Sequence, residues 1–243
     1  MNFATYEVEA KVESTHWWFV GRRKLFAILI AGLDFPKDCP VLDIGTSTGT
    51  NLRMLRDIGF TKVLGLDLRD EAIEWCAAKG LGAVLKGDVC SMPIGNGEYQ
   101  LVLATDVIEH VDDDVSALRE IYRVLKSGGY ALVTVPTFQS LWGLQDDVGQ
   151  HKRRYTRKEL IEKLDRAGFV VDRCFYFNYL LFVPIWLARR VIRIINLKIK
   201  SEGELNSPTI NFFLKSIFLC DVATAEFIKP NFGVSALALV RKL

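Results

Sequence analysis

The sequence lacks a clear excess of charge of either sign. Its 31 Lys and Arg residues stand against 29 Asp and Glu residues, which leaves a formal net charge of +2. A protein that binds nucleic acid on its own usually carries a basic patch or a basic tail, and neither is present here. The composition therefore predicts a small or amphiphilic partner and no nucleic acid.

Paired cysteines and long apolar runs are also missing. The odd number and scattered spacing of the five cysteines predict neither a disulfide framework nor a metal site, so no metal is expected. The apolar run from Tyr179 to Ala188 falls short of the ~18 residues that a membrane span needs. Because the first residues also lack the pattern of a secretory signal, we expect a cytoplasmic protein that is soluble or peripheral to a membrane.

What the sequence does contain is a regular alternation of apolar runs and helical patterns. Strands are predicted at 40–44, 62–67, 83–86, 100–104, 130–135, 169–176 and 233–241. Helices are predicted at 50–58, 70–79, 113–126 and 156–167, with Gly128 capping the third and Thr156 opening the fourth. This alternation is typical of βαβ units, so residues 1–243 are expected to form one α/β domain around a mostly parallel, doubly wound sheet.

Two segments do not fit this alternation. Residues 1–30 contain three successive aromatic residues that cannot all face one core, so a helical lid is predicted, with packing on the flank of the sheet as the alternative. Residues 178–230 are too long for a plain connection, which predicts a helical insertion before the last strand. This insertion is expected to be a lid or an interface subdomain.

The first part of the insertion is an apolar-basic helix on a helical projection. Arg189, Arg193, Asn196 and Lys200 share one face, and apolar residues including Leu187 and Val191 share the other. A pattern of this kind is typical of a helix that lies on an anionic membrane surface. A membrane contact through 179–220 is therefore one hypothesis, and a lid or a homodimer interface is the other.

The strand predicted at 40–44 runs into a glycine turn at Gly45, and Gly49 opens the next helix. Gly45 permits a tight turn, and Gly49 is expected to let a ligand approach the start of the helix. A glycine-rich turn alone is shared by many nucleotide binders. Asp43 separates them, because a carboxylate there repels a pyrophosphate but suits the ammonium group of S-adenosylmethionine (SAM).

Acidic residues also follow the next two predicted strands. Asp67 lies about twenty residues further on, where a carboxylate can accept hydrogen bonds from both ribose hydroxyls. Asp88 can accept from an adenine amino group while the backbone N–H of Val89 meets a ring nitrogen. The alternatives are a helix cap for Asp67 and an ordinary loop residue for Asp88.

Four stretches together resemble the seven-stranded class I SAM-dependent methyltransferases, particularly small-molecule O-methyltransferases of the ubiquinone-biosynthesis type. They are VLDIGTSTG, LGLDLRDEAIEWC, GDVCSMPIGNGEYQLVLATDVIEHVDD and LKSGGYALVTVPT, within residues 40–135. The resemblance implies strand order 3-2-1-4-5-7-6 with strand 7 antiparallel, SAM as cofactor and S-adenosylhomocysteine (SAH) as product. It also implies that Leu68 packs on the adenine, and it differs at Ser47, which replaces a glycine and is expected to widen the turn. The predicted cofactor-binding residues are Asp43, Gly45, Thr46, Gly49, Asp67, Leu68, Asp88, Val89 and Thr105.

The fourth strand ends in Thr105-Asp-Val-Ile-Glu-His110, which should border the transferred methyl group. This is not the Asn/Asp-Pro-Pro-aromatic pattern of amide or adenine N-methylation, so an oxygen acceptor is favoured. His110 and His151 are candidate bases, although His110 has a structural role as its alternative. Arg154 and Tyr155 are candidate acceptor-binding residues, with Arg153 as a second cation and a solvated charged loop as the alternative.

These patterns predict methyl transfer from SAM to an oxygen of a small or lipid-like acceptor, by in-line displacement on the sulfonium methyl group. An NAD-dependent oxidoreductase is disfavoured by Asp43 and by the missing G-x-G-x-x-G pattern. A SAM-binding module without catalysis stays open, because no residue is an unmistakable base. An RNA methyltransferase is disfavoured by the charge balance.

Overall fold

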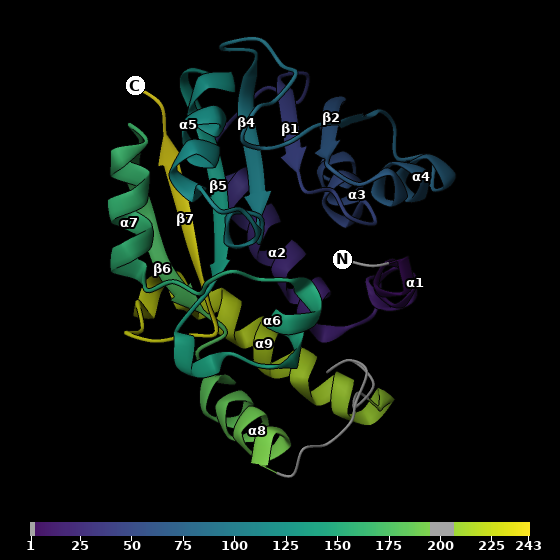
Figure 1. Ribbon diagram of the computed structural model, residues 1–243, viewed down its shortest axis with the longest axis vertical. Coiled ribbons are helices and arrows are strands. Elements are labelled where there is room, and N and C mark those ends of the chain that lie inside the picture. Colours follow the sequence, from purple (N-terminus) through teal and green to yellow (C-terminus); the bar gives the residue numbers. More distant parts are fainter. Residues whose placement is uncertain (1–2, 195–206) are drawn as a thin grey trace.

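A computed structural model describes residues 3–194 and 207–243. Its seven strands form one sheet in the order β3-β2-β1-β4-β5-β7-β6 (Figure 1). Strands β1 to β5 are parallel, and β7 is antiparallel to both β5 and β6. The predicted fold class and strand order are therefore confirmed. The strands are β1 (Pro40–Ile44), β2 (Lys62–Asp67), β3 (Val84–Lys86), β4 (Tyr99–Thr105), β5 (Leu125–Pro136), β6 (Val170–Phe177) and β7 (Ser235–Arg241).

Helices cover both faces of this sheet because the central strands are apolar on both sides. Leu101 and Leu103 of β4 pack with one group of helices, whereas Val102 and Ala104 pack with the other. The first group is α2 (Trp17–Ala31), α3 (Thr50–Asp57) and α9 (Pro208–Ile228), and the second is α5 (Asp114–Val124) and α7 (Arg157–Arg166). The remaining helices are α1 (Phe3–Val12), α4 (Asp70–Ala78), α6 (Leu144–Gly149) and α8 (Phe182–Ile194), with short 3-10 turns η1 (Ile108–His110) and η2 (Gln139–Leu141).

The helix boundaries follow the predictions except at the end of α5. The helix stops at Val124 and the chain continues directly into β5, so the glycine cap predicted at Gly128 is wrong. Leu125 is fully buried and extended, so the helix ends two residues before the predicted residue 126. The backbone N–H of Gly128 donates to the Lys242 carbonyl at 2.8 Å. The capping box of α7 is confirmed, since Thr156 and Glu159 each accept a hydrogen bond from the other's backbone N–H.

The insertion before β7 is helical, as predicted. Helix α9 packs along α2, where the Phe218 ring lies 5.3 Å from the Trp17 ring and 5.4 Å from the Trp18 ring between centroids. A Cβ at position 21 would lie 2.2 Å from Phe218, so Gly21 permits this close approach. The aromatic run near the N-terminus thus packs largely on the flank of the sheet, through α9.

Helix α8 turns its basic face toward the protein and its apolar face toward solvent. Arg189 and Arg193 donate to the carbonyls of Leu141 and Trp142 in and beside η2, so they are directed toward the protein. The apolar stripe is exposed instead, at Val183, Leu187, Val191 and Ile194. Residues 195–206, which include the predicted continuation of the basic face at Asn196 and Lys200, lie outside the described residues. Within the described residues, no helix is both long and apolar enough to cross a bilayer.

Candidate functional site

A cavity of about 290 Å³ opens at the carboxyl ends of the parallel strands, where ligands of open α/β sheets bind. We call it the strand-tip cavity. Helices α1 and α6 lie beyond these strand ends (Figure 1). Five predicted cofactor residues line the cavity, and they are Gly45, Asp67, Leu68, Asp88 and Val89. Tyr6, Asp106 and His110 line it as well.

The turn after β1 can be built only with a glycine at its first position. Gly45 has a φ of 71°, and a Cβ there would lie 2.8 Å from the Cγ2 atom of Val107. Its backbone N–H donates to the Leu66 carbonyl at 2.8 Å, which ties the tip of β1 to that of β2. The backbone of the turn therefore borders the cavity directly.

Asp43 is fully buried at the base of this turn. The Asn51 amide donates to its Oδ1 at 3.1 Å, while its buried Oδ2 has no hydrogen-bond partner among the described residues. Burial raises the pKa of Asp43 to about 7, against the opposing effect of the Asn51 hydrogen bond. The same amide donates to Thr105 Oγ1 at 3.0 Å, so Asn51 bridges the tips of β1 and β4. Asn51 is not among the residues predicted from the sequence; its only signal was its place in the first turn after the glycine loop.

Asp67 is held rigidly at the tip of β2. Its two carboxylate oxygens accept backbone N–H groups from Ser47 and Arg69, each at 3.0 Å. Burial raises the pKa of Asp67, and these backbone hydrogen bonds counteract part of that rise. Each oxygen keeps a second lone pair, which is what two ribose hydroxyls require.

Ser47 is turned toward α1. It has a φ of 47°, and its hydroxyl donates to Glu9 Oε2 at 3.0 Å, while Thr48 donates to the other Glu9 oxygen at 3.3 Å. Glu13 also pairs with Lys79 at 2.7 Å, which joins the end of α1 to α4. A serine in the turn thus provides an anchor for the N-terminal helix, a role that the sequence pattern did not indicate.

Two predicted cofactor residues have packing roles that the sequence analysis did not anticipate. The space beside Gly49 is filled by protein, because a Cβ there would lie 2.4 Å from Leu81 Cδ1 and 3.0 Å from Cys76 Sγ. Gly49 therefore allows close packing of α3 and does not open a path for a ligand, which corrects the expectation. The Thr46 methyl group lies against Gly65 of β2. Neither Gly49 nor Thr46 lines the strand-tip cavity.

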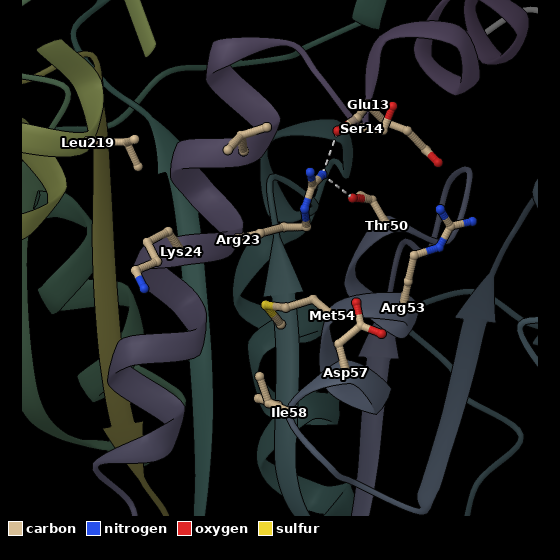
Figure 2. Close-up of a pocket in the computed structure, with 11 residues that line it drawn as sticks. Glu13, Ser14, Arg23, Lys24, Thr50, Arg53, Met54, Asp57, Ile58 and Leu219 are labelled. Atoms are coloured by element: carbon tan, nitrogen blue, oxygen red, sulfur yellow. Dashed lines mark hydrogen bonds between the residues drawn. The ribbon is translucent and has the colours of Figure 1, made fainter. Parts of the chain in front are cut away.

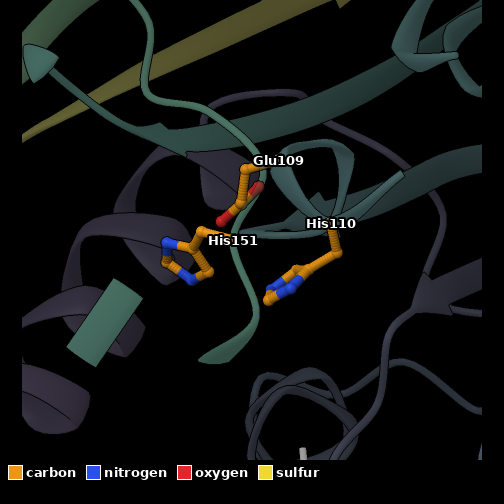
Figure 3. Close-up of side chains that lie close together, drawn as sticks. All are labelled: Glu109, His110 and His151. Atoms are coloured by element: carbon orange, nitrogen blue, oxygen red, sulfur yellow. The ribbon is translucent and has the colours of Figure 1, made fainter. Parts of the chain in front are cut away.

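At the other side of the cavity, three side chains gather at the end of β4 and after α6. The rings of His110 and His151 lie 4.7 Å apart between centroids, and the buried carboxyl group of Glu109 lies beside them (Figure 3). Burial, together with the neighbouring His151, lowers the pKa of His110 to about 4. Burial and the charge of Asp106 raise the pKa of Glu109 well above its usual range.

His151 is oriented by a buried ion pair. Its Nδ1 atom lies 2.8 Å from Asp146 Oδ1, and Arg154 donates to both Asp146 oxygens at 2.8 Å. Although burial raises the pKa of Asp146, hydrogen bonds from His151 and Arg154 hold it below its usual range. The segment, for which a solvated charged loop was the alternative to an acceptor site, is thus a short helix followed by a tightly paired turn.

The candidate acceptor-binding residues are engaged within the protein. Arg154 is 3% exposed and pairs with Asp146, and Arg153 pairs with Asp114 at 3.2 Å. Tyr155 is 2% exposed, and its hydroxyl donates to Asp114 Oδ2 at 2.8 Å. None of the three lines the strand-tip cavity. The structure therefore favours a structural role for these residues over the predicted contact with an acceptor.

A second cavity, of about 490 Å³, lies between α2 and α3 (Figure 2). Arg23 crosses it and donates to the Glu13 carbonyl and to Thr50 Oγ1, both at 2.7 Å. None of the predicted cofactor, base or acceptor residues lines it. The strand-tip cavity is therefore the candidate site.

Comparison with known proteins agrees with this geometry. Residues 42–133 match the family described as methyltransferase domain. The chain is 31% identical over 146 residues to malonyl-acyl-carrier-protein O-methyltransferase of Herminiimonas arsenicoxydans, which covers 57% of this chain and 55% of that protein. A SAM-dependent methyltransferase structure from Archaeoglobus fulgidus is similar with a TM-score of 0.57 and 20% identity, covering 90% of this chain and 94% of that one. Residues 42–133 are therefore similar to a methyltransferase domain, and the fold is similar to that of SAM-dependent methyltransferases.

SAM is accordingly the cofactor of this protein. The fit is supported by the unpartnered Oδ2 of buried Asp43, which can take a cationic partner, and by the two oriented oxygens of Asp67. Leu68, 56% exposed beside the cavity, offers an apolar surface for an adenine ring. Asp88 accepts from the Cys90 backbone N–H at 2.8 Å, so its carboxylate is fixed at the cavity wall.

The relatives do not define the acceptor. The chain spans 52% and 44% of the length of the first two curated relatives that it matches. A tRNA (carboxymethyluridine(34)-5-O)-methyltransferase of Mus musculus is 26% identical over 134 residues, covering 54% of this chain and 19% of that protein. The exclusion of nucleic acid therefore gains no support from the relatives and stays a prediction, as does the resemblance to ubiquinone-biosynthesis enzymes.

Proposed function

We propose that this methyltransferase transfers the SAM methyl group to an oxygen of a small or lipid-like acceptor. The observation that carries the proposal is the pair of carboxylates at adjacent strand tips, Asp43 with an unpartnered buried oxygen and Asp67 clamped by two backbone N–H groups. The oxidoreductase alternative gains no support from the comparisons.

The protein's part in this reaction is mainly positioning. SAM supplies a sulfonium methyl group that is already electrophilic. Asp67 orients the ribose and Asp43 balances the charge of the methionine end, so that the acceptor can be held in line with the leaving sulfur. Such alignment can account for a large part of the rate acceleration. His110, which lines the cavity beside Asp106, borders the place where the acceptor oxygen would lie.

The N-terminal helix is well placed to close the cofactor site. Tyr6 is 3% exposed and lines the strand-tip cavity, and Glu9 holds the turn through Ser47. These contacts support our proposal that, within residues 1–30, helix α1 acts as a lid that is held by the turn at Ser47.

The reaction is tested by incubating the purified protein with methyl-labelled SAM and fractionated extracts, followed by mass spectrometry. We expect label in a hydroxyl-bearing compound and none with heat-inactivated protein. Binding of SAH without transfer to any fraction would support a non-catalytic SAM-binding module instead.

Substitution of His151 by alanine is expected to lower turnover about 100-fold, while SAM affinity changes less than about twofold, because the ring packs 4.7 Å from that of His110, which lines the cavity. Steady-state kinetics and calorimetric SAM titration measure the two effects. The matched control is His16→Asn, which can keep the cap that His16 Nδ1 provides to the Trp18 N–H. Equal losses in turnover and SAM affinity would argue for a purely structural His151.

We further propose that the insertion contacts a lipid surface. Val183, Leu187, Val191 and Ile194 of α8 are exposed, as are Ile210, Phe212, Phe213 and Ile217 of α9. Neither α8 nor the part of α9 before Asp221 contains an acidic residue, whereas Arg190 and Lys215 add positive charge. Exposed apolar side chains flanked by cations suit an anionic bilayer.

A double substitution of Phe212 and Phe213 by serine should abolish co-flotation with anionic phosphatidylglycerol vesicles, because these side chains are 65% and 61% exposed. Ile28→Ser, at an exposed apolar residue of α2, is the control that should leave flotation unchanged. Wild-type protein that stays unbound at all lipid concentrations, or that forms a dimer lost in the double variant, would refute the lipid contact.

A further inference from the structure

Glu109, His110 and His151 form a compact group that we call the Glu-His-His cluster. Each side chain offers one donor atom, and these three atoms all lie within 4.8 Å of one another. Figure 3 shows the carboxyl group and the two rings gathered around one small space. The residues come from η1 and from the turn after α6, which are 41 residues apart in sequence at their nearest.

The carboxyl group of this cluster has no partner of its own. Glu109 is fully buried, and neither of its oxygens has a hydrogen-bond partner among the described residues. A buried carboxyl group left in this way is costly unless a cation or a donor compensates it. Gly149 lets the two rings approach the backbone closely, because a Cβ there would lie 3.0 Å from His151 Nε2 and 3.8 Å from His110 Cε1.

His151 is held in the manner of a metal ligand. Asp146 binds Nδ1 at 2.8 Å, which leaves Nε2 directed to the side of Gly149 and His110. Asp146 is itself fixed by Arg154 and is fully buried. Metal-binding histidines commonly donate their other ring nitrogen to a carboxylate, which sets the tautomer and the orientation of the ring.

From these contacts we propose that the Glu-His-His cluster binds one divalent transition-metal ion. Two imidazoles and one carboxylate are a donor set that suits Mn²⁺, Fe²⁺ or Zn²⁺ and leaves coordination positions open. Neighbouring ligand atoms on such an ion lie about 3.0–3.4 Å apart at the usual metal–nitrogen distance of about 2.1 Å, against separations of up to 4.8 Å here. Small side-chain rotations therefore suffice to close the site.

This site rests on the proposed function and gives its acceptor end a specific chemistry. His110 lines the strand-tip cavity, so an ion held there could take an acceptor hydroxyl at an open position. A metal ion lowers the pKa of a bound hydroxyl group, which then loses its proton to solvent. The oxygen forms a bond to the methyl carbon, the carbon–sulfur bond breaks, and the sulfonium becomes the neutral thioether of SAH. In this account the two histidines are ligands and the metal replaces a protein base.

The site is tested with Mn²⁺ alone, by electron paramagnetic resonance titration of the full chain after treatment with a chelator. We expect one Mn²⁺ per chain, a loss of affinity of at least about 100-fold in Glu109→Gln and in His151→Gln, and about a tenfold loss in Asp146→Asn, which acts through His151. The His16→Asn variant removes the one histidine of the chain outside the cluster and should bind Mn²⁺ like the wild type.

Circular dichroism identifies any variant that fails to fold. If Glu109→Gln does not fold, because its carboxyl group is buried, His151→Gln alone tests the metal site. No stoichiometric Mn²⁺ or Zn²⁺ binding by the wild type, or equal binding by wild type and His151→Gln, would overturn the metal site and leave a hydrogen-bonded cluster. SAM titration of the same samples separates this failure from that of the proposed function. A protein that binds SAM but no metal refutes only the metal site, whereas one that binds metal but not SAM refutes the methyltransferase activity.

Discussion

Replacement of Asp43 by asparagine is expected to stabilise the free protein at pH 8 and to abolish its binding of SAM. The carboxyl group is fully buried with one unpartnered oxygen, so its ionised form is unfavourable until a cation arrives. Asparagine removes this charge and can still accept the Asn51 hydrogen bond at Oδ1. It cannot balance the charge of the SAM methionine end.

The effect of Asp43→Asn on the stability of the free protein should depend on pH. Burial raises the pKa of Asp43 from its ordinary value of 3.8 to about 7 in the folded protein. The folded state therefore holds more protons than the unfolded state between these values, and this group's contribution to stability becomes less favourable as pH rises through that window. At about 1.36 kcal/mol per pKa unit, the stability advantage of Asp43→Asn should grow by roughly 2.5 kcal/mol between pH 5 and pH 8.

Urea unfolding of wild type and Asp43→Asn at the two pH values measures the difference directly. Asp70→Asn is a suitable control, because that exposed carboxylate pairs with Lys86 at the surface. A stability difference that does not change with pH would show that Asp43 titrates normally. If Asp43→Asn kept its affinity for SAM, Asp43 would not be the partner of the cationic ligand.

Replacement of Asp67 by alanine should lower the affinity for SAM and SAH at least about 100-fold. Two hydrogen bonds from ribose hydroxyls to a charged acceptor are lost, and each is worth roughly 1.5–3 kcal/mol. The domain should stay folded, because Asp67 is 8% exposed at the cavity and water can reach the Ser47 and Arg69 N–H groups.

Calorimetric titration of SAH into Asp67→Ala, with Asp70→Ala beside it, checks this result. The control removes a carboxylate three residues away, in the first turn of α4. Unchanged affinity in Asp67→Ala would mean that the ribose lies elsewhere. An equal loss in both variants would point to a general charge effect in place of a specific contact.

The sheet and the cofactor turn could be predicted from the sequence because local patterns determine them. Alternating apolar runs placed the seven strands, and Gly45, with a φ of 71°, occupies a turn that needs a glycine. Asp43 and Asp67 could be found for the same reason, since each stands at the end of an apolar strand and the ends of parallel strands meet at one edge.

The acceptor end could not be predicted because it depends on contacts between distant segments. From the sequence alone, Arg154 and Tyr155 are plausible residues for binding an acceptor. In the fold, Arg154 is buried against Asp146 and the Tyr155 hydroxyl donates to Asp114. Likewise, the helical projection of α8 identified its two faces, but only the packing on η2 decides which face is covered. Glu109 and His151 are brought together by the turn after α6, which no periodicity in the sequence indicates.

The central claim is that the carboxylates at the tips of β1 and β2 hold one adenosyl ligand, and a crystal structure with SAH tests it most directly. We predict the ribose hydroxyls on Asp67, the amino group of the homocysteine end beside Gly45 and Asp43, and the adenine against Leu68. A structure with SAH bound away from these strand tips, or with no SAH bound at saturating concentration, would contradict the claim.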